Sequence, residues 1–342
     1  MAFSHIPVLL NEVLEGLNIK SNGIYVDATF GRGGHSKKIL ERLDENGRLY
    51  GLDRDLAAVE AAKAIEDSRF TIVHSAFSNL KEVCTNLGIL GKVDGILMDI
   101  GVSSPQIDDP SRGFSFEKDG PLDMRMDQSS SLTAKTIVNT YSKQDLAYIF
   151  KVYGEENFAA KVATAIVRQR EIKPFETTLE LSEFIKRVIG GKPTPKHKAT
   201  RCFQALRIAV NAELDELKQA LEGSLDVLAT DGRLCVISFH SLEDRIVKNF
   251  IKDQSQGQKV PSGLPITYEE AEKQVPFDDI VDYILKQLEF GYSEYRFRLL
   301  PIISVPLDLC PEVSFCALSE EVHSPEIPCA GLQERSHGHP DR

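Results

Sequence analysis

The chain has 342 residues, of which 42% are hydrophobic and 27% charged, and its formal net charge is −11. These values are typical of a globular protein large enough for two domains, so the composition excludes a fibrous or fully disordered chain. No segment approaches the roughly 20 consecutive apolar residues of a membrane helix, and no basic leader begins the chain, so we expect a cytoplasmic protein. The six cysteines form no CxxC pair, which supports neither a disulfide framework nor a metal site.

The stretch over residues 23–55 has the pattern of a strand, a glycine turn, a helix and a second strand. The first apolar run ends in Asp27, the turn contains Gly33 and Gly34, and the second run ends in Asp53. Ligands of open parallel sheets bind at the carboxyl ends of the strands, and glycines allow the backbone to approach them closely. Asp53 is placed to accept hydrogen bonds from ribose hydroxyls, so the pattern predicts a nucleoside-cofactor site.

The turn reads GRGGHS and lacks the third glycine of the dinucleotide motif G-x-G-x-x-G. Asp27 at the end of the first strand would repel a pyrophosphate but suits the cationic amino-acid end of S-adenosylmethionine. We therefore favour S-adenosylmethionine over a dinucleotide as the cofactor. The alternative is a glycine turn that only packs a helix on a strand.

The next elements are a helix over residues 56–65, a strand over 69–74 and a strand over 93–98. Phe77 follows the first of these strands, where it can stack on adenine or belong to the core. Asp99 ends the second strand, where the reacting methyl group and its target should meet. The alternative for Asp99 is a structural role in capping the backbone of Ser103 and Ser104.

From residue 107 to 201 the strand pattern stops and helical periodicity takes over. Helices are predicted over residues 133–141, 144–153, 157–170 and 179–189. Eleven Lys and Arg against four Glu lie between Lys161 and Arg207, most densely at residues 192–201. A basic face of this kind would answer the objection that an acidic chain cannot bind nucleic acid, although charge runs are usually only solvated surface.

The α/β pattern returns with one helix predicted over residues 202–221 and a strand over 233–239. Ser241 is predicted to cap the following helix, with Asp244 in the third position after it. His240 and Glu243 are placed near Asp99; His240 could bind a phosphate or the target base, or hydrogen-bond within its own turn. Residues 292–305 could supply a final strand.

Several segments together closely resemble the MraW family. They are HIPVLLNEVL, DATFGRGGHS, LDRD, DGILMDIGVSSPQIDDPSRGFSF, DGPLDMRMD, YGEE, TRCFQALRIAVNAEL and ISFHSLEDRIVK, in unbroken order from His5 to about Leu264. Members are bacterial methyltransferases that modify the N4 amino group of a cytosine in the decoding region of small-subunit (16S) ribosomal RNA.

The resemblance implies an α/β, Rossmann-like methyltransferase fold with a mostly parallel sheet, helices on both faces and an inserted helical RNA-recognition domain. The expected domains are residues 1–106 with 202–306, the insertion 107–201, and a disordered, divergent tail 307–342. The cofactor contacts fall on Gly33, Gly34, His35, Asp53, Phe77, Asp99 and Gln106, of which His35 and Gln106 come from the resemblance alone.

For the chemistry we expect direct methyl transfer, with Asp99 as the acceptor of a hydrogen bond from the amino group. The base, presented unstacked, would contact Ser103, Ser104 and His240 and stack on Phe114 and Phe116. Phosphates would contact Lys196, Lys198 and Arg201. The expected partner is 16S rRNA in the small ribosomal subunit, with neither membrane nor metal, and a homodimer is left open.

After about Thr267 the chain departs from the family, because the Asn-Pro-Arg-Ser-x-Ser-like stretch of other members has no match here. Sheet completion and full activity depend on this region. Two other classes of function therefore stay open: an RNA-binding ribosome assembly factor that has lost catalysis, and an NAD-dependent oxidoreductase.

Overall fold

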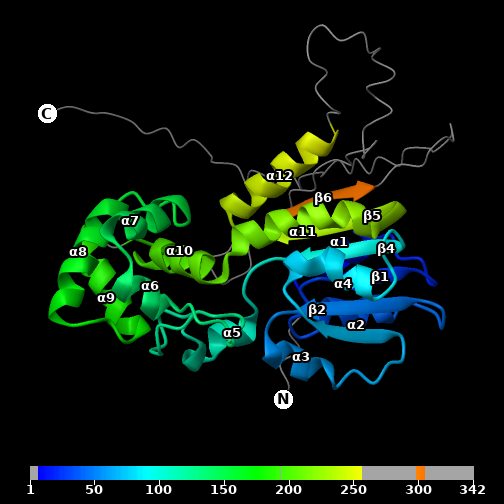
Figure 1. Cartoon of the computed structure of the whole chain (residues 1–342), viewed down its shortest axis with the longest axis horizontal. Coiled ribbons are helices and arrows are strands. Elements are labelled where there is room, and N and C mark those ends of the chain that lie inside the picture. The colour runs from blue at the N-terminus through cyan, green and yellow to red at the C-terminus, as the bar shows by residue number, and fades with distance from the viewer. Residues whose placement is uncertain (1–6, 193, 256–297, 305–342) are drawn as a thin grey trace, which may run out of the picture. The chain divides into compact units, whose positions relative to one another are not determined.

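The computed structural model describes residues 7–192, 194–255 and 298–304. Within them the chain forms a six-stranded sheet of order β3-β2-β1-β4-β5-β6 (Figure 1). The strands are β1 (Ile24–Asp27), β2 (Arg48–Asp53), β3 (Phe70–His74), β4 (Val93–Asp99), β5 (Leu228–Ser238) and β6 (Arg298–Ser304). The first five are parallel and β6 is antiparallel to β5. This arrangement confirms the predicted Rossmann-like fold.

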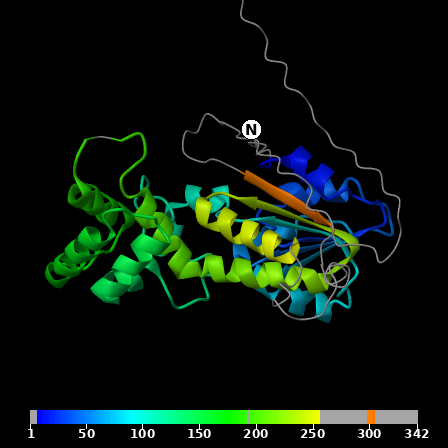
Figure 2. The same ribbon diagram turned by 90° about the horizontal axis from the view of Figure 1, so that it is seen from above.

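Helices cover both faces of the sheet, which Figure 2 shows from above. They are α1 (Leu10–Gly16), α2 (Gly34–Leu40), α3 (Leu56–Ala62), α4 (Leu80–Asn86), α11 (Glu213–Val227) and α12 (Ser241–Ser255). Helices α4, α11 and α12 pack with Ile96 and Met98 of β4, whereas α1 and α2 pack with Leu97. Successive side chains of a strand point to opposite faces, so the unbroken apolar run of β4 reflects a strand buried on both sides.

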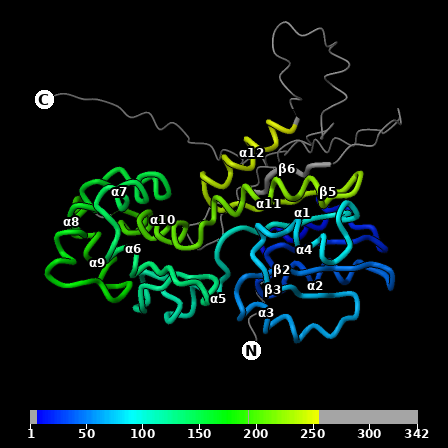
Figure 3. Tube along the Cα trace, viewed as in Figure 1, coloured from blue at the N-terminus to red at the C-terminus, as the bar shows by residue number. Residues whose placement is uncertain are grey.

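A second core lies among the helices between β4 and β5, where Figure 3 traces the chain out of one strand and back into the other. The helices of this core are α6 (Ala134–Thr140), α7 (Lys143–Val152), α8 (Ala159–Ile172), α9 (Thr178–Ile189) and α10 (Thr200–Asn211), and the short helix α5 (Ser104–Asp108) precedes them in the chain. Val138, Phe150, Ile166, Leu181 and Leu206 are fully buried in this core. The four helices predicted here are present, with ends shifted by one or two residues.

Helix α10 packs in this helical core, although the predicted domain boundary at residue 202 falls within its first turn and assigns most of the helix to the other domain. The division into a methyltransferase domain and an inserted RNA-recognition domain stays a prediction. The short 3₁₀ turns η1 (Phe77–Asn79) and η2 (Pro110–Arg112) follow β3 and α5. Of the last strand predicted over residues 292–305, residues 298–304 form β6. The rest of that prediction, the departure from the family between residues 268 and 297, and the tail 307–342 lie outside the described residues.

The single helix predicted over residues 202–221 is wrong, because the chain breaks at Ala212. This residue has φ 51° in the left-handed region, and α11 restarts at Glu213. At the end of α10, the buried side-chain amide of Asn211 accepts a hydrogen bond of 2.8 Å from the Met126 N–H. The acidic first turn of α11 also favours a helix start there, because carboxylates stabilise the positive end of the helix dipole.

The predicted cap of α12 is also wrong in its details. Ser241 is the first helical residue, and its Oγ donates to Glu155 Oε2 at 3.0 Å instead of capping the helix. The carboxylate that caps the first turn belongs to Glu243, whose Oε2 accepts from the backbone N–H of His240 at 3.3 Å. The capping-box position is therefore filled by Glu, its usual partner, one residue earlier than predicted.

No helix in the part of the chain that the structure describes is long and apolar enough to cross a membrane. Across the same ranges, no group of three or more His, Cys, Asp or Glu side chains is arranged to hold a metal ion. Cys84, Cys202 and Cys235 are buried free thiols, and burial raises the pKa of each, which disfavours a reactive thiolate.

The left-handed conformation of Ala212 leads to a testable prediction about stability. Ala212→Gly should raise the free energy of unfolding by roughly 1 kcal/mol, because glycine adopts this conformation without the steric cost of a Cβ. Ala209→Gly, in the interior of α10, is the matched control and should lower it by about 1 kcal/mol. Urea unfolding gives the free energy of unfolding of both variants and of the parent chain. If the two variants lose the same amount of stability, Ala212 is not strained in the parent chain.

Candidate active site

Three aspartates end the neighbouring strands β1, β2 and β4 at one edge of the sheet. Asp27 is buried, and its Oδ2 accepts a hydrogen bond of 2.6 Å from Ser36 Oγ. Burial raises the pKa of Asp27, against the lowering effects of the Ser36 hydrogen bond and the charge of His35. The charged form is therefore poorly solvated, and a positive charge placed beside it would be stabilised.

Asp53 ties the tip of β2 to the glycine turn after β1. Its Oδ2 accepts from the Gly31 N–H at 2.7 Å and its Oδ1 from the Asp55 N–H at 2.8 Å. Burial nevertheless raises the pKa of Asp53 to about 6, helped by the charges of Asp55 and Asp27. Each carboxylate oxygen has a second lone pair, so Asp53 can still accept hydrogen bonds from a ligand.

The carboxylate of Asp99 has fewer hydrogen-bond partners than those of Asp27 and Asp53. Its backbone N–H donates to Thr29 Oγ1 at 2.6 Å, which fixes the end of β4. One carboxyl oxygen, Oδ2, lies 3.7 Å from His35 Nδ1, whereas Oδ1 is buried and has no hydrogen-bond partner among the described residues. Burial raises the pKa of Asp99 to about 7, with further increases from the charges of Asp27 and Glu243 and a decrease from His35.

The structural alternative for Asp99 stays open, although the Ser103 backbone has another partner. The backbone N–H of Ser103 donates to Gln106 Oε1 at 2.9 Å, in a capping box at the start of α5. Asp99 Oδ1 is thus not used as a cap for this turn. A buried acceptor without a partner is costly for the folded state, and such groups are typical of ligand sites.

The glycine turn and the N-terminal segment close around the same edge. Gly33 has φ 72°, and a Cβ on Gly34 would lie 2.6 Å from Pro7 Cγ, so neither position accepts a larger residue without a shift of its neighbours. His35, buried in the first turn of α2, places its Nε2 2.9 Å from the Val8 carbonyl oxygen. This histidine therefore links the N-terminal segment to the Asp99 carboxylate.

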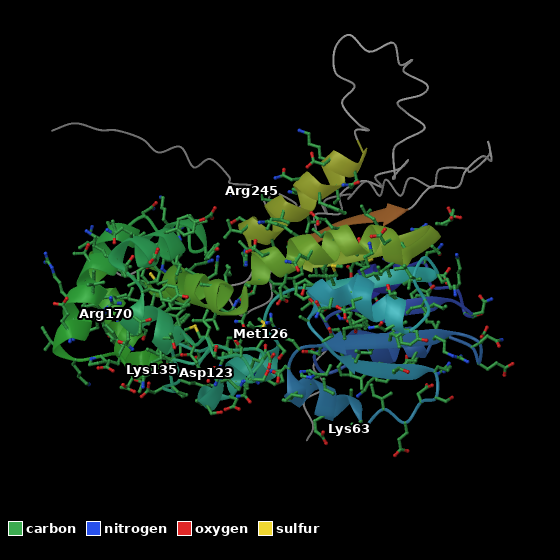
Figure 4. The ribbon with its side chains drawn as sticks, viewed as in Figure 1. Lys63, Asp123, Met126, Lys135, Arg170 and Arg245 are labelled. Atoms are coloured by element: carbon green, nitrogen blue, oxygen red, sulfur yellow. The ribbon has the colours of Figure 1, made fainter. Side chains whose placement is uncertain are left out.

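Gln106 belongs to a buried polar network rather than standing free. Its Nε2 donates to Asp55 Oδ2 at 2.9 Å, and Arg112 Nη1 donates to the same oxygen at 2.8 Å. Arg112 Nη2 reaches the carbonyl oxygens of Arg125 and Met126, both at 3.0 Å; Figure 4 labels Met126. The network joins the end of β2 to the loop that leads into the helical core. Sequence reasoning did not single out Asp55 or Arg112, because their pairing depends on the tertiary fold.

Phe77 is half-buried at the start of η1 and packs against the sheet core, so both of its predicted roles stay open. Phe116 stacks on His197 with ring centroids 5.0 Å apart and meets Phe203 edge-on at 5.5 Å. Phe114 lies under the Arg112 guanidinium at 5.9 Å. The two predicted stacking residues are thus held by the helical core and by the Arg112 network.

The contacts of the three predicted phosphate-binding cations can be described one by one. Lys198 Nζ donates to the carbonyl oxygens of Gly190 and Gly191, and Arg201 Nη1 donates to the Glu155 carbonyl oxygen at 3.1 Å. Lys196 is exposed. Lys198 and Arg201 therefore already bond to backbone, and a phosphate would have to share or replace those bonds.

His240 and Glu243 lie just beyond β5, next to the Asp99 edge. His240 Nε2 lies 3.1 Å from Glu243 Oε1, and their side chains are 11% and 0% exposed. Burial alone would raise the pKa of Glu243, but the hydrogen bonding and charge of His240 and the charge of Arg207 outweigh it and lower the pKa. Sequence reasoning placed Glu243 here without giving it a role.

The arrangement suits a ligand that carries a positive charge and hydroxyl groups. Buried carboxylates with raised pKa values favour a cation, and they disfavour a phosphate or pyrophosphate. Hydroxyls find acceptors on Asp53, and the glycine turn permits close approach of a ligand to the backbone.

Comparisons with known proteins agree with this chemistry. A sequence model of the MraW methylase family matches residues 2–280. The "Ribosomal RNA small subunit methyltransferase H" of Shewanella oneidensis is 55% identical over 272 residues, which cover 79% of this chain and 87% of that protein. The protein of the same name from Shewanella halifaxensis is 56% identical over 272 residues, with 79% and 86% covered.

Among solved structures, the 1,6-didemethyltoxoflavin-N1-methyltransferase of Burkholderia thailandensis, with bound S-adenosylhomocysteine, superimposes with a TM-score of 0.37 at 10% identity. The superposition covers 89% of this chain and 80% of that one.

The raised pKa of Asp99 predicts how stability depends on pH. A carboxyl whose pKa rises on folding, here from 3.8 to about 7, stabilises the fold fully below pH 4, and this contribution is lost as the pH rises through 7. Asp99→Asn should therefore become more stable than the parent chain as the pH rises, by up to about 4 kcal/mol. Urea unfolding between pH 4 and 8 measures this difference, and a difference independent of pH would refute it.

The Asp55–Arg112 pair gives a second prediction, because both side chains are 8% exposed. Arg112→Met alone should lower the free energy of unfolding by about 3–5 kcal/mol, since it leaves a buried carboxylate uncompensated. Combining it with Asp55→Asn should cost clearly less than the sum of the single changes. Lys81→Met, which removes an exposed pair with Asp226, is the control and should cost less than about 1 kcal/mol. Additive losses in the double variant would argue against the pairing.

Proposed function

The chain belongs to the MraW methylase family, and we propose that it methylates the N4 amino group of a cytosine in the decoding region of 16S ribosomal RNA, with S-adenosylmethionine as the methyl donor. The observation that carries this proposal is the buried, unpartnered Oδ1 of Asp99 at the carboxyl edge of the sheet. An amino group is a hydrogen-bond donor, and this oxygen is an acceptor that has none. The family and the names of the relatives support the substrate class.

The residues at this edge fit the proposed cofactor. When bound, S-adenosylmethionine supplies a methyl group activated by a neighbouring sulfonium charge. Asp53 would accept hydrogen bonds from its ribose hydroxyls, and Gly33 and Gly34 would let the backbone approach it. The carboxylates of Asp27 and Asp99 would offset its positive charges, and Phe77 would cover the adenine. His35 and Gln106 would hold the surrounding turns in place through the contacts they already make.

The proposed reaction demands orientation more than covalent help. The N4 lone pair is delocalised into the pyrimidine ring, so the amino group is a poor nucleophile. Asp99, fixed by the Thr29 hydrogen bond to its backbone, would accept a hydrogen bond from N4 and hold the nitrogen in line with the methyl carbon. The buried cysteines are not needed, because the ring itself is not attacked.

The target base must be unstacked to reach the sheet edge, as single-stranded or flipped-out RNA. Ser103, Ser104 and His240 would line its position, and Phe114 and Phe116 would offer aromatic faces for stacking. Lys196, Lys198 and Arg201 would contact phosphates. These assignments are our proposal for the RNA side of the site.

The two other classes of function, an NAD-dependent oxidoreductase and an assembly factor without catalysis, would use the carboxyl edge of the sheet differently. An NAD-dependent oxidoreductase would place a pyrophosphate beside Asp27, whose burial already disfavours negative charge. An assembly factor without catalysis would have no use for the unpartnered Asp99 oxygen. Both would bind their ligands without transferring a methyl group.

The direct test is transfer of labelled methyl from S-adenosylmethionine to small ribosomal subunits that lack this modification, followed by nucleoside analysis. N4-methylcytidine is the expected product. Cofactor binding without transfer would favour the assembly factor and point to the region after Thr267. NAD binding without S-adenosylmethionine binding would favour the oxidoreductase.

Asp99→Asn gives a prediction for catalysis, because the amide keeps the shape of the side chain but removes its charge. The rate of methyl transfer should fall at least 100-fold, the scale of losing one oriented electrostatic contact in an active site. Asp226→Asn, which alters an exposed ion pair on α11, is the matched control and should keep the parent rate. A near-normal rate in Asp99→Asn would remove this residue from the mechanism.

A further inference from the structure

We propose that His240 is the proton acceptor for the target amino group and that Glu243 is the residue that positions its imidazole ring. The inference rests on the proposed methyl transfer to N4 and adds a second protein group to it. Nothing in the family description or in the names of the relatives assigns these two residues. The juxtaposition of a buried imidazole, a buried carboxylate and the Asp99 edge carries the proposal.

The pair has the geometry of an oriented base. Glu243 is fully buried, and its Oε2 accepts from the backbone N–H groups of Phe239, at 2.8 Å, and His240, at 3.3 Å. Its other oxygen, Oε1, lies 3.1 Å from His240 Nε2, within reach of a hydrogen bond although not aligned for one. Such contacts are often loose before the substrate binds.

A carboxylate at Nε2 selects the tautomer that carries its proton there. In a neutral imidazole the other nitrogen, Nδ1, then bears the free lone pair. His240 Nδ1 is buried and has no hydrogen-bond partner in the ranges that the structure describes. An imidazole braced by a carboxylate on one nitrogen, with the other nitrogen free, is the arrangement of a general base.

The sheet brings this pair to Asp99. In the parallel register of β4 and β5, Asp99 pairs with Ile237, and the Ile100 N–H donates to the Ile237 carbonyl oxygen at 3.0 Å. The turns that follow the two strands also touch, because a Cβ on Gly101 would lie 3.4 Å from the Phe239 ring. Consistent with this placement, the charge of Glu243 contributes to raising the pKa of Asp99.

Asp99 alone would be a poor proton acceptor once the site is filled. A cation beside its carboxylate stabilises the charged form and so lowers its pKa from about 7. The ionised carboxylate remains a good hydrogen-bond acceptor, but it holds a proton less well. A second group is therefore needed for the proton, and His240 is a buried histidine at this edge whose Nδ1 is unused.

The proposed step transfers one methyl group and one proton. The N4 lone pair forms the new bond to the methyl carbon, and the electron pair of the broken carbon–sulfur bond stays on the sulfur. One of the two N4 protons passes to His240 Nδ1, and the other stays on the methylated nitrogen. The positive charge of the sulfonium thus ends on the imidazolium, which Glu243 stabilises before the proton leaves to water.

Several charged groups near His240 and Glu243 will influence how the pair responds to pH. Arg207, from α10, lowers the pKa of Glu243 and also makes a two-point pair with Glu213 at 2.8 and 2.9 Å. Asp99, at the end of β4, interacts by charge with Glu243, and Asp27 of β1 and His35 of α2 in turn act on Asp99. On α12 itself, Asp244 pairs with Lys248 at 3.0 Å, and Arg245 (Figure 4) pairs with Glu155 at 3.2 Å.

The test compares His240→Gln and Glu243→Gln with the parent chain, using the modification-free small subunit as substrate. His240→Gln should lower kcat about 100-fold or more, the usual scale of general base catalysis, while the calorimetric Kd for S-adenosylmethionine and the KM for subunits change less than about threefold. Glu243→Gln should lower kcat less and change the pH dependence of kcat. The controls His74→Gln and Glu222→Gln replace exposed residues and should keep the parent values.

A spectroscopic measurement keeps the proposal testable if a variant folds poorly. In the parent chain with ¹⁵N-labelled histidine, the His240 ring should show a proton on Nε2 and an unprotonated Nδ1 in its neutral form. The reverse tautomer would overturn the proposal, as would a His240→Gln kcat within threefold of the parent value. If the parent chain transfers no methyl group at all, the proposed function itself fails. An active parent with an unaffected His240→Gln variant overturns only the role of His240.

Discussion

The folded chain holds three carboxylates with raised pKa values at one edge of its sheet. Asp27, Asp53 and Asp99 end adjacent strands, and the parallel register brings them together whatever their side chains are. Burial raises the pKa of each. Holding charged groups in such a place is unfavourable unless a ligand compensates for them, and the rest of the site can be understood from that constraint.

Two features of the surrounding structure keep these carboxylates in place. The glycine turn gives a backbone N–H to Asp53, and Thr29 fixes the end of β4 at Asp99. On the other side, Asp55 and Arg112 join the tip of β2 to the loop that enters the helical core. The strand end proposed to bind the ribose is thus connected by buried hydrogen bonds to the segment proposed to meet RNA.

Site residues could be predicted from the sequence where their role follows from their position at the end of a strand. Asp53 and Asp99 could be predicted because a parallel sheet places every strand end at one edge, and the long apolar run of β4 showed that it is central. The break at Ala212 could not be predicted, since apolar periodicity continues through it and the hydrogen bond beside it, between Asn211 and the distant Met126, forms only in the tertiary fold.

Other site residues could not be predicted, because their roles depend on contacts made only in the folded chain. Asp55 and Arg112 lie 57 positions apart, and only the tertiary fold reveals their pairing. Glu243 lay within a recognised motif, but its role depends on the direction of its side chain, back towards His240, which helix periodicity does not settle. Contacts across the fold therefore supplied what local pattern could not.

The central claim is that the carboxylate edge accepts a cationic cofactor, and proton release on binding tests it most directly. Calorimetric titration with S-adenosylmethionine at pH 7, in buffers of different ionisation enthalpy, gives the number of protons released. Because the pKa of Asp99 is about 7 before binding, about half a proton should leave when the cation holds this carboxylate ionised. S-adenosylhomocysteine, which lacks the sulfonium charge, should release fewer. Equal proton counts for the two ligands, or no release at all, would contradict the account.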